Sequence, residues 1–390
     1  MKRTRRAVLG TAALSTAGCL DRIGRAVSRS AAPECPARVG GDVDARLGFV
    51  GDVMLGRGVD ERWADGPPDG IWGSTFDRVR SLDGLFLNLE CCLSARGSPR
   101  PGRTYHFRAD PDWAVPALRA GGVTWASLAN NHVLDYGRGA FSDTLAHLSG
   151  GGVAHAGAGR DVAAATEPSV VEVGGLSVAV VAFTDRSASY GAGPDSPGTA
   201  FVRTDPGNPR TRRLIDASLA RAREAEPDLV VASLHWGPNW ETRPSRAQRR
   251  FARSLVDRGV DLVHGHSAHV IQGVEVYRGR PIVYDAGDFV DDYAVKSELH
   301  NDRSFLFELV VDDGVAESLR LVPVVIEREA ATRADAEAAG WLRERMRSLS
   351  AAFGTTVRRD GDGLRIPLDR CGTVDRRRSG RRRPSGRTPV

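Results

Sequence analysis

The sequence predicts an α/β protein built in layers, and three observations support that prediction. Strand-like and helix-like segments alternate from Arg46 to about Ile326. An apolar fraction of 41% in a chain of 390 residues is enough to bury one large core or two smaller ones. Several apolar segments end in a carboxylate, an amide or an imidazole, as strands do where loops converge on a ligand. Such alternation favours largely parallel strands covered by helices.

Apolar runs and alternating patterns predict the strands, and apolar residues at helical spacing predict the helices. The expected strands cover residues 46–55, 84–90, 123–128, 176–183, 228–234, 260–264, 281–285, 304–311 and 319–326. The expected helices cover residues 111–120, 139–149, 210–224, 245–258 and 333–352. We assign one domain to residues 46–355. A linker rich in Pro, Gly and Ala precedes it at 30–45, and a low-complexity basic tail, expected to be disordered, follows at 372–390.

Residues 1–29 contain an export signal and the start of the mature chain. Arg5 and Arg6 precede an apolar run that is too short to span a membrane, and small residues follow as far as Cys19. The arginine pair resembles a twin-arginine signal, and "LSTAGC" resembles a lipobox, whose cysteine is lipidated and becomes the first mature residue. An ordinary cleaved signal or an anchor helix is the alternative. We expect a lipid anchor at Cys19 on the outer face of the cell membrane.

The formal net charge of +5 is concentrated at the two ends of the chain. Residues 1–30 and residues 371–390 contribute +6 each, which leaves −7 on the body between them. A nucleic-acid-binding domain needs a basic stripe on its folded surface, which an acidic body does not predict. We therefore expect no nucleic acid among the partners.

Four cysteines follow Cys19, namely Cys35, Cys91, Cys92 and Cys371. Four cysteines allow three disulfide connectivities, and adjacent cysteines are poorly placed to bridge each other. The sequence has no CxxC spacing, so a zinc ribbon has no support.

Side chains of the metal-ligand type follow the expected strands. Taken singly, each has an ordinary explanation, such as a helix cap, a turn or a hydrogen-bonded core histidine. Taken together, they suit a divalent ion that accepts oxygen and nitrogen ligands, such as Mn, Zn or Fe, and not a thiolate site. These residues are Asp52, Glu90, Asn130, Asn131, His132, Asp135, His235, His264, His266 and His269.

Six ordered segments resemble the motifs of the CapA family, the poly-gamma-glutamate capsule-synthesis proteins. They are "GDVMLGR", "LNLE", "LANNHVLDYG", "SLHWG", "GHSAHVIQGVE" and "YDAGDF", spread over roughly residues 46–290. That family resembles the calcineurin-like metallophosphoesterases. The resemblance therefore implies a metallophosphatase-like four-layer sandwich, with two central mixed β-sheets flanked by helices, and one or two bound divalent ions.

The resemblance also implies roles for individual residues. His132 corresponds to the histidine that acts on the substrate, and Asp135, one turn further on, is a candidate to orient its ring. Glu90 corresponds to the acidic residue that bridges or shares the metals. Met54 and Asp288 depart from the family pattern, since many relatives have a histidine and an asparagine at those places. The implied metal ligands are Asp52, Glu90, Asn131, His235, His266 and His269.

Two classes of function follow. The first is a metal-dependent hydrolase of phosphate ester or amide bonds, in which the metal activates a water and His132 protonates the leaving group. The second is a non-catalytic component that binds an anionic polymer such as poly-gamma-glutamate, or assembles with its synthase complex. We favour a role in capsule or exopolymer synthesis with a real metal centre, and leave turnover open.

Overall fold

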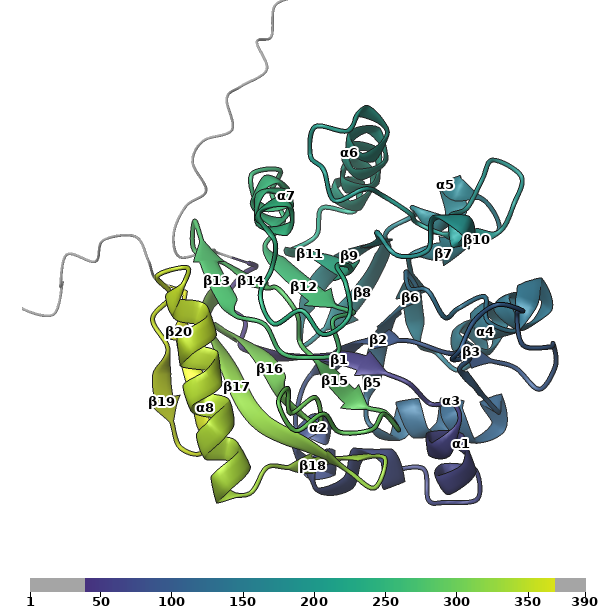
Figure 1. Ribbon diagram of the computed structural model, residues 1–390. Coiled ribbons are helices and arrows are strands. Elements are labelled where there is room, and N and C mark those ends of the chain that lie inside the picture. Colours follow the sequence, from purple (N-terminus) through teal and green to yellow (C-terminus); the bar gives the residue numbers. More distant parts are fainter. Residues whose placement is uncertain (1–38, 369–390) are drawn as a thin grey trace, which may run out of the picture. The chain divides into compact units, whose positions relative to one another are not determined.

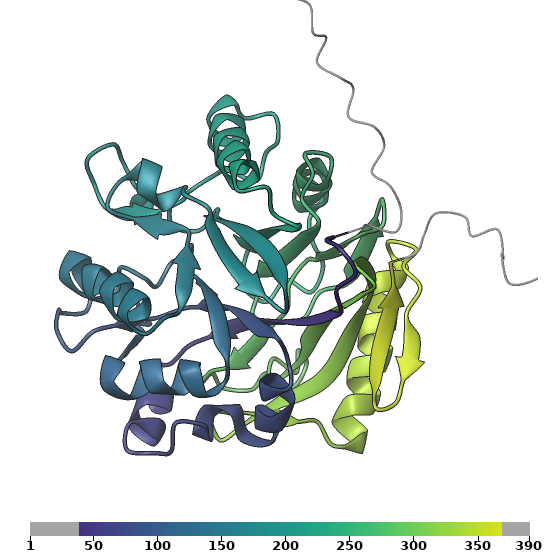
Figure 2. The same cartoon turned by 180° about the vertical axis from the view of Figure 1, so that it is seen from behind.

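Two β-sheets pack face to face, and helices cover the outer side of each (Figures 1 and 2). This computed structural model describes residues 39–368. The four layers are helices, a larger sheet, a smaller sheet and helices. The arrangement confirms the predicted α/β sandwich of two mixed sheets flanked by helices.

The larger sheet has ten strands. They are β1 (Ala45–Val53), β2 (Gly84–Leu89), β5 (Val123–Ser127), β6 (Ala154–Ala156), β15 (Asp288–Val290), β16 (Arg303–Asp312), β17 (Val315–Glu327), β18 (Ala330–Arg333), β19 (Arg358–Asp360) and β20 (Gly363–Pro367). Their order is β19-β20-β17-β16-β1-β2-β5-β6, with β15 beside β1 and β18 beside β17. β1 is parallel to β2 and β15 but antiparallel to β16. The sheet therefore changes at β1 from parallel to antiparallel pairing.

The smaller sheet has six strands in the order β13-β14-β12-β11-β9-β8. They are β8 (Ser169–Val173), β9 (Leu176–Thr184), β11 (Leu229–His235), β12 (Leu262–His266), β13 (Val274–Tyr277) and β14 (Arg280–Val283). The four inner strands are parallel to one another, and β8 and β13 are antiparallel edges. Two short pairs lie outside the sheets: β3 (Cys92–Leu93) with β4 (Arg108–Ala109), and β7 (Ala158–Gly159) with β10 (Gly198–Thr199).

Most of the longer helices begin at a side chain that caps the first turn. Ser245 forms a capping box with Gln248, and Asp110, Asn208 and Asp335 each accept a hydrogen bond from a backbone N–H of the first turn. The helices are α1 (Gly58–Trp63), α2 (Phe76–Arg80), α3 (Pro111–Ala120), α4 (Gly137–Gly150), α5 (Val162–Ala165), α6 (Pro209–Glu224), α7 (Arg246–Val256) and α8 (Ala336–Ala351), with 3-10 turns η1 (Gly70–Thr75) and η2 (Ala188–Tyr190).

The central strands are apolar on both faces because each sheet is covered on both sides. On β9, Val178 and Val180 enter the core between the sheets, while Ala179 and Val181 face α6 and α7. The outer face of the larger sheet packs on α1 to α4 in the same way. α8 instead adds Leu342, together with neighbouring apolar side chains, to the edge of the core between the sheets.

Every expected strand and helix has a counterpart in the structure. The expectation of largely parallel strands is wrong for one half of the larger sheet, where β16, β17 and β20 follow one another as antiparallel neighbours. The sheet also continues past residue 355, where we expected the domain to end, because β19 and β20 pair at its edge.

Several expectations lie outside the described residues. These are the export signal with Arg5, Arg6 and Cys19, the first part of the linker, Cys35, Cys371 and the basic tail. Within residues 39–368, Cys91 and Cys92 are buried free thiols. No helix in that range is both long enough and apolar enough to cross a membrane.

Candidate metal centre

The carboxyl end of β1 brings three polar side chains of the larger sheet together. Asp52 pairs in register with Asn88 on β2 and with Asp288 on β15, so the three lie side by side on one edge. Asn88 Nδ2 donates to Asp52 Oδ1 over 2.7 Å. The neighbouring Gly51 permits this approach, since a Cβ there would lie 1.7 Å from Gly287 O. Glycine is thus required beside the central carboxylate.

The smaller sheet contributes two imidazoles by the same rule. His235 and His266 are register partners at the ends of the parallel strands β11 and β12, and their Nδ1 atoms lie 3.0 Å apart. Asp52 Oδ1 is 3.9 Å from His235 Nδ1 and 3.5 Å from His266 Nδ1. Ser233 Oγ lies 2.9 Å from His266 Nε2 and fixes that ring. Three potential ligands from two sheets therefore surround one point.

A second group forms on the other side of Asp52. His269 follows β12, and its Nδ1 lies 3.2 Å from Asp52 Oδ2 and 2.9 Å from Asp288 Oδ1. Asp52, Glu90 and His269 form one candidate ion-binding group, and Asp52, His235 and His266 form another, with the ligand atoms of each group within 4.8 Å of one another. Asp52, rather than Glu90, is thus the carboxylate common to both groups.

Asn131 and Glu90 complete this cluster on the side of the larger sheet. Asn131 Oδ1 is 2.8 Å from His235 Nε2, and Glu90 Oε1 is 3.5 Å from the same nitrogen. Asn130 points elsewhere, because its Oδ1 accepts from the backbone N–H groups of His132 and Val133. Asn130 closes the turn, and Asn131 faces the cluster. All six predicted metal ligands are therefore gathered in one place.

Burial lowers the pKa of the clustered histidines, and only neighbouring carboxylates can raise it again. It lowers the pKa of His235 and of His266 well below the usual range, so both rings can offer a lone pair. Burial acts the same way on His269, but Asp288 and Asp52 outweigh it and raise the pKa of that ring well above its usual range.

Burial has the opposite effect on the carboxyl groups in and beside the cluster, because it raises their pKa. Burial, and then the charge of Asp52, raise the pKa of Glu90 and of Asp285 well above the usual range. Burial also raises the pKa of Asp52, but hydrogen bonding and charge interaction with His269 reverse that and leave it lowered. Several buried acids in one small volume need positive charge nearby to stay ionised.

The donor set fits a divalent metal ion. Glu90 Oε1 is buried, yet it accepts no hydrogen bond from a described residue. An orphaned carboxylate oxygen in a protein interior is costly unless a cation or donor meets it. Carboxylate, amide and imidazole donors together suit a borderline or hard ion and not a thiolate-preferring one.

His132 and Asp135 form a pair at the edge of this cluster. His132 Nδ1 lies 2.5 Å from Asp135 Oδ2, and His132 Nε2 faces Glu90 Oε1 at 3.7 Å. Asp135 is held in turn by the backbone N–H of Phe107 and the hydroxyl of Tyr190. Burial lowers the pKa of His132, and Asp135 opposes that shift. The carboxylate therefore holds the ring with Nε2 toward Glu90.

A cavity of about 330 Å³ opens over the cluster and reaches it through Asn131. Asn131 and His132 line its floor, and Arg103, Arg186 and Tyr293 are among the residues of its walls. Arg103 Nη1 donates to Asn131 O over 2.5 Å and to Tyr190 OH over 3.0 Å, so this arginine braces the histidine loop.

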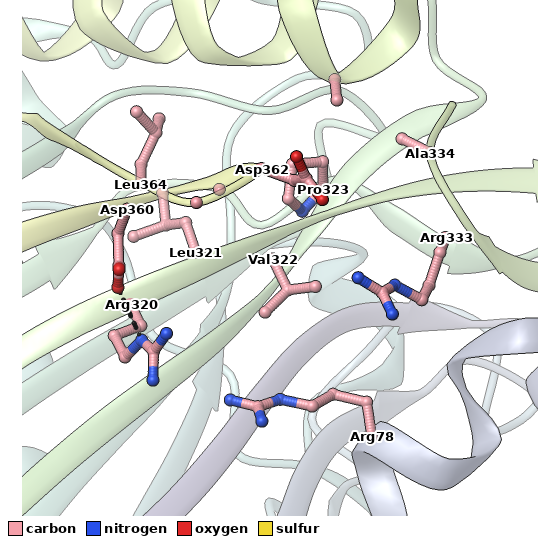
Figure 3. A pocket seen from close by; sticks show the side chains of 13 residues that line it. Arg78, Arg320, Leu321, Val322, Pro323, Arg333, Ala334, Asp360, Asp362 and Leu364 are labelled. Atoms are coloured by element: carbon pink, nitrogen blue, oxygen red, sulfur yellow. Dashed lines mark ion pairs between the residues drawn. The ribbon is translucent and has the colours of Figure 1, made fainter. Parts of the chain in front are cut away.

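A separate cavity of about 260 Å³ lies under α8, between β17, β18 and the β19–β20 turn (Figure 3). Arg78, Arg320 and Arg333 line it. Two of these charges are already neutralised, since Arg78 pairs with Glu308 and Arg320 pairs with Asp360. None of the predicted metal or catalytic residues is among its described lining residues. The cavity over the metal-ligand cluster is therefore the candidate site.

Sequence reasoning missed several residues that shape the site. Asp285 is an acidic neighbour within "YDAGDF", a motif that offered a usable signal. Asn88 lies inside the apolar strand β2, and alternation alone does not reveal it. Arg103 comes from a loop and Tyr190 from the short 3-10 turn η2, and neither has a recognisable sequence pattern. Their roles depend on tertiary contacts that no local pattern records.

Comparison with known proteins identifies similar sequences. A sequence model of the family described as "Bacterial capsule synthesis protein PGA_cap" matches residues 46–293. The chain is 34% identical over 364 residues to a Mycobacterium tuberculosis protein named "Probable polyglutamine synthesis accessory protein", covering 80% of this chain and 93% of that one. It is 30% identical over 247 residues to "PGA biosynthesis protein CapA" of Bacillus subtilis, covering 63% of this chain and 62% of that one.

Similarity to solved structures is weaker. A hypothetical protein from Thermus thermophilus overlaps with a TM-score of 0.38 at 16% identity, over 74% of this chain and 96% of that one. A 5'-nucleotidase precursor from the same organism overlaps with a TM-score of 0.36 at 14% identity, over 79% of this chain and 59% of that one. These overlaps carry no argument about the present site, which stands on its own geometry.

Proposed function

The chain belongs to the bacterial capsule synthesis family PGA_cap, and from that premise we propose that it is a metal-dependent hydrolase acting in the synthesis of an anionic capsule polymer. Its substrate in this proposal is a phosphate ester or amide bond in, or attached to, such a polymer. The ion in this proposal is Mn, Zn or Fe, held by the carboxylates and imidazoles of the cluster together with Asn131.

One observation carries the proposal. Asn131, whose amide oxygen contacts His235 of the metal-ligand cluster, and His132, whose ring Asp135 orients, both line the same cavity. A structural ion site needs only closed coordination, without a titratable group directed into an open cavity beside it. A hydrolytic site needs both features, because charge and a proton must be delivered to the same substrate atoms.

Each residue contributes a defined action. A divalent ion bound at the cluster would supply Lewis acidity toward a water and a substrate oxygen. Asn88 holds Asp52 in position, and Ser233 holds the ring of His266. Asp135 orients His132 through Nδ1, and Nε2, which also lies 3.3 Å from Arg103 Nη2, is the nitrogen that would carry a proton to the leaving group.

The test contrasts two neighbouring residues. His132→Ala should keep the metal content of the wild type but lower hydrolysis of an aryl phosphodiester or a gamma-glutamyl polymer by about 10²-fold to 10⁴-fold, since a general acid serves the leaving group and not the ion. Asn131→Ala should reduce both metal content and hydrolysis, because its amide oxygen faces His235. Elemental analysis and steady-state kinetics measure the two quantities.

His147→Ala is the matched control, because His147 is an exposed histidine on α4 and should leave metal content and rate unchanged. Wild-type protein that holds no stoichiometric ion after metal-supplemented expression would contradict the proposal. So would a His132→Ala variant that hydrolyses either substrate at the wild-type rate.

A second candidate function is a non-catalytic component that binds the polymer or its synthase complex. The names of two similar proteins favour it, because one is called an accessory protein and the other a biosynthesis protein, and neither name states an enzymatic activity. Polymer export that depends on the protein in cells but is unaffected by His132→Ala would select this candidate.

A further inference from the structure

Arg186 lies on the wall of the cavity over the metal-ligand cluster, just after β9 ends at Thr184. The side chain is held from two sides: Nη1 donates to Gly237 O over 2.7 Å, and Nη2 donates to Asn239 Oδ1 over 2.9 Å. Its backbone N–H donates to Thr184 Oγ1 over 2.9 Å. The guanidinium is therefore fixed while it remains half-buried beside open space.

The partners of Arg186 are neutral, which sets it apart from its neighbour Arg103. Within residues 39–368, no carboxylate oxygen lies within 4.0 Å of the Arg186 guanidinium. Arg103 Nε, by contrast, lies 3.4 Å from Asp135 Oδ1. The carboxylate of Asp185 is also engaged, since it accepts from Gly237 N and Thr204 Oγ1. Arg186 thus presents an oriented positive charge that no described carboxylate neutralises.

Arg186 shares its cavity with two residues of the proposed site. The lining includes His132 and Asn131, and Asn131 contacts His235 of the metal-ligand cluster. A ligand bound to Arg186 would therefore share the cavity with His132.

We propose that Arg186 is a substrate-binding residue that takes an oxyanion group, a carboxylate or a phosphate, next to the bond that reacts. A guanidinium has five N–H donors, and the bonds to Gly237 and Asn239 use two of them. The remaining donors of its planar fork match the two oxygens of such an anion. This inference rests on the proposed function and narrows the substrate to an anion carrying that group beside the reacting bond.

The experiment measures anion binding rather than turnover. Inorganic phosphate and glutarate are titrated calorimetrically, in separate arms, into metal-supplemented wild type, Arg186→Met, Arg186→Lys and Asn239→Ala. Arg186→Met should weaken binding by about 10-fold to 100-fold, the effect of losing hydrogen bonds to a charged group. Arg186→Lys should lose less, because it keeps the charge but not the fork. Asn239→Ala should fall between wild type and Arg186→Met, because it removes only the orienting acceptor.

Arg160→Met is the control for loss of one positive charge, since the Arg160 side chain is 90% exposed and Arg160 does not line this cavity. It should bind both probes as wild type does. A loss seen only with phosphate assigns a phosphate ester to Arg186, and a loss seen only with glutarate assigns a carboxylate. Metal content, measured on the same samples, should not change in any variant.

Equal dissociation constants for wild type and Arg186→Met in both arms would overturn the inference. Binding of neither probe by the wild type would overturn it too. If the wild type holds no metal, the proposed function fails separately, and the same titrations still decide on Arg186, because its guanidinium is positioned by protein groups alone. If Arg186→Met does not fold, Arg186→Lys and Asn239→Ala carry the comparison.

Discussion

His264 and His266 lie two residues apart on β12, yet their surroundings differ. His264 Nε2 lies 2.9 Å from Val50 O, so it joins the smaller sheet to the larger one. Burial lowers the pKa of His264 to about 4, which keeps the ring neutral as a hydrogen-bond donor. His266 instead turns Nδ1 toward Asp52 and His235. One histidine is placed to join the sheets and the other to hold an ion.

The two alanine variants should separate these roles. His266→Ala should remove most of the bound metal, since losing one ligand of a closed set sharply lowers affinity. His264→Ala should keep the metal but lower the free energy of unfolding by about 1–3 kcal/mol, because Val50 O loses its buried partner. Elemental analysis and urea denaturation measure the two effects. Loss of metal from the His264 variant alone would reverse the assignment.

Metal ligands at the ends of strands can be recognised in the sequence, whereas site residues that lie elsewhere cannot. Asp52, His235 and His266 stand where apolar runs end, and the structure gathers them. Arg186 and Arg103 are two of many arginines in this chain. Only the packing of loops around one cavity distinguishes them, and that depends on contacts between residues far apart in the sequence.

Among the elements, the short helix α2 is held to β16 by a largely buried ion pair. Glu308 is buried beneath the helix, and Arg78 Nε donates to its Oε1 over 2.6 Å, with a second contact from Nη2 to Oε2. The bidentate geometry satisfies a carboxylate that has no access to solvent. This contact fixes α2 to the antiparallel half of the larger sheet.

Arg78→Met should destabilise the protein toward the lower end of about 3–5 kcal/mol, because Glu308 stays buried without its partner while the Arg78 side chain is 28% exposed. The double variant Arg78→Met with Glu308→Leu should recover most of the loss, since no unpaired charge remains. Chemical denaturation of the single and double variants measures both. A double variant as unstable as the single one would show that packing, not charge, holds α2.

The sequence predicts long elements well and short ones poorly. α3 falls at the expected residues 111–120 because Asp110 and Pro111 mark its start. β19 and β20 were not expected, since neither is long enough to establish a period and both depend on β17 as a template. A strand also has a similar local sequence pattern whether its neighbour is parallel or antiparallel. The sequence therefore did not predict the antiparallel half of the larger sheet.

For the whole molecule, the metal-ligand cluster lies across the seam between the two sheets. Asp52 and Glu90 come from the larger sheet, and His235 and His266 come from the smaller one. An ion bound there stabilises the folded state relative to the unfolded one by mass action. Removing it should therefore weaken the docking of one sheet on the other, and not only the site.

A chelator should lower the midpoint of thermal unfolding of the wild type by on the order of 5 °C at ion concentrations well above the dissociation constant. His266→Ala should unfold at a lower temperature and show almost no further drop with chelator. Differential scanning calorimetry of both proteins measures this. An equal drop in the two proteins would indicate an ion bound elsewhere.

We propose that the protein acts on the outer face of the cell membrane, anchored by a lipid on Cys19. The motif of Arg5, Arg6 and Cys19 supports this proposal. One lipid chain anchors only marginally, so a second contact is expected, and the arginine tail is a candidate. Cys19→Ser should release the protein from salt-washed membranes, as followed by fractionation. A variant that stays fully bound would exclude lipidation as the anchor.

The ribosome synthesises β1 early, but one of the strands that pair with it is synthesised much later. It lies inside the larger sheet, but its antiparallel neighbour β16 begins only at Arg303. For most of synthesis, one edge of β1 is open, with the aggregation hazard of an unpaired strand. His235 and His266 emerge far behind Asp52 as well. Ribosome-bound chains that end before residue 235 should therefore hold no ion, and the ion acquired is the one available where translation and folding finish.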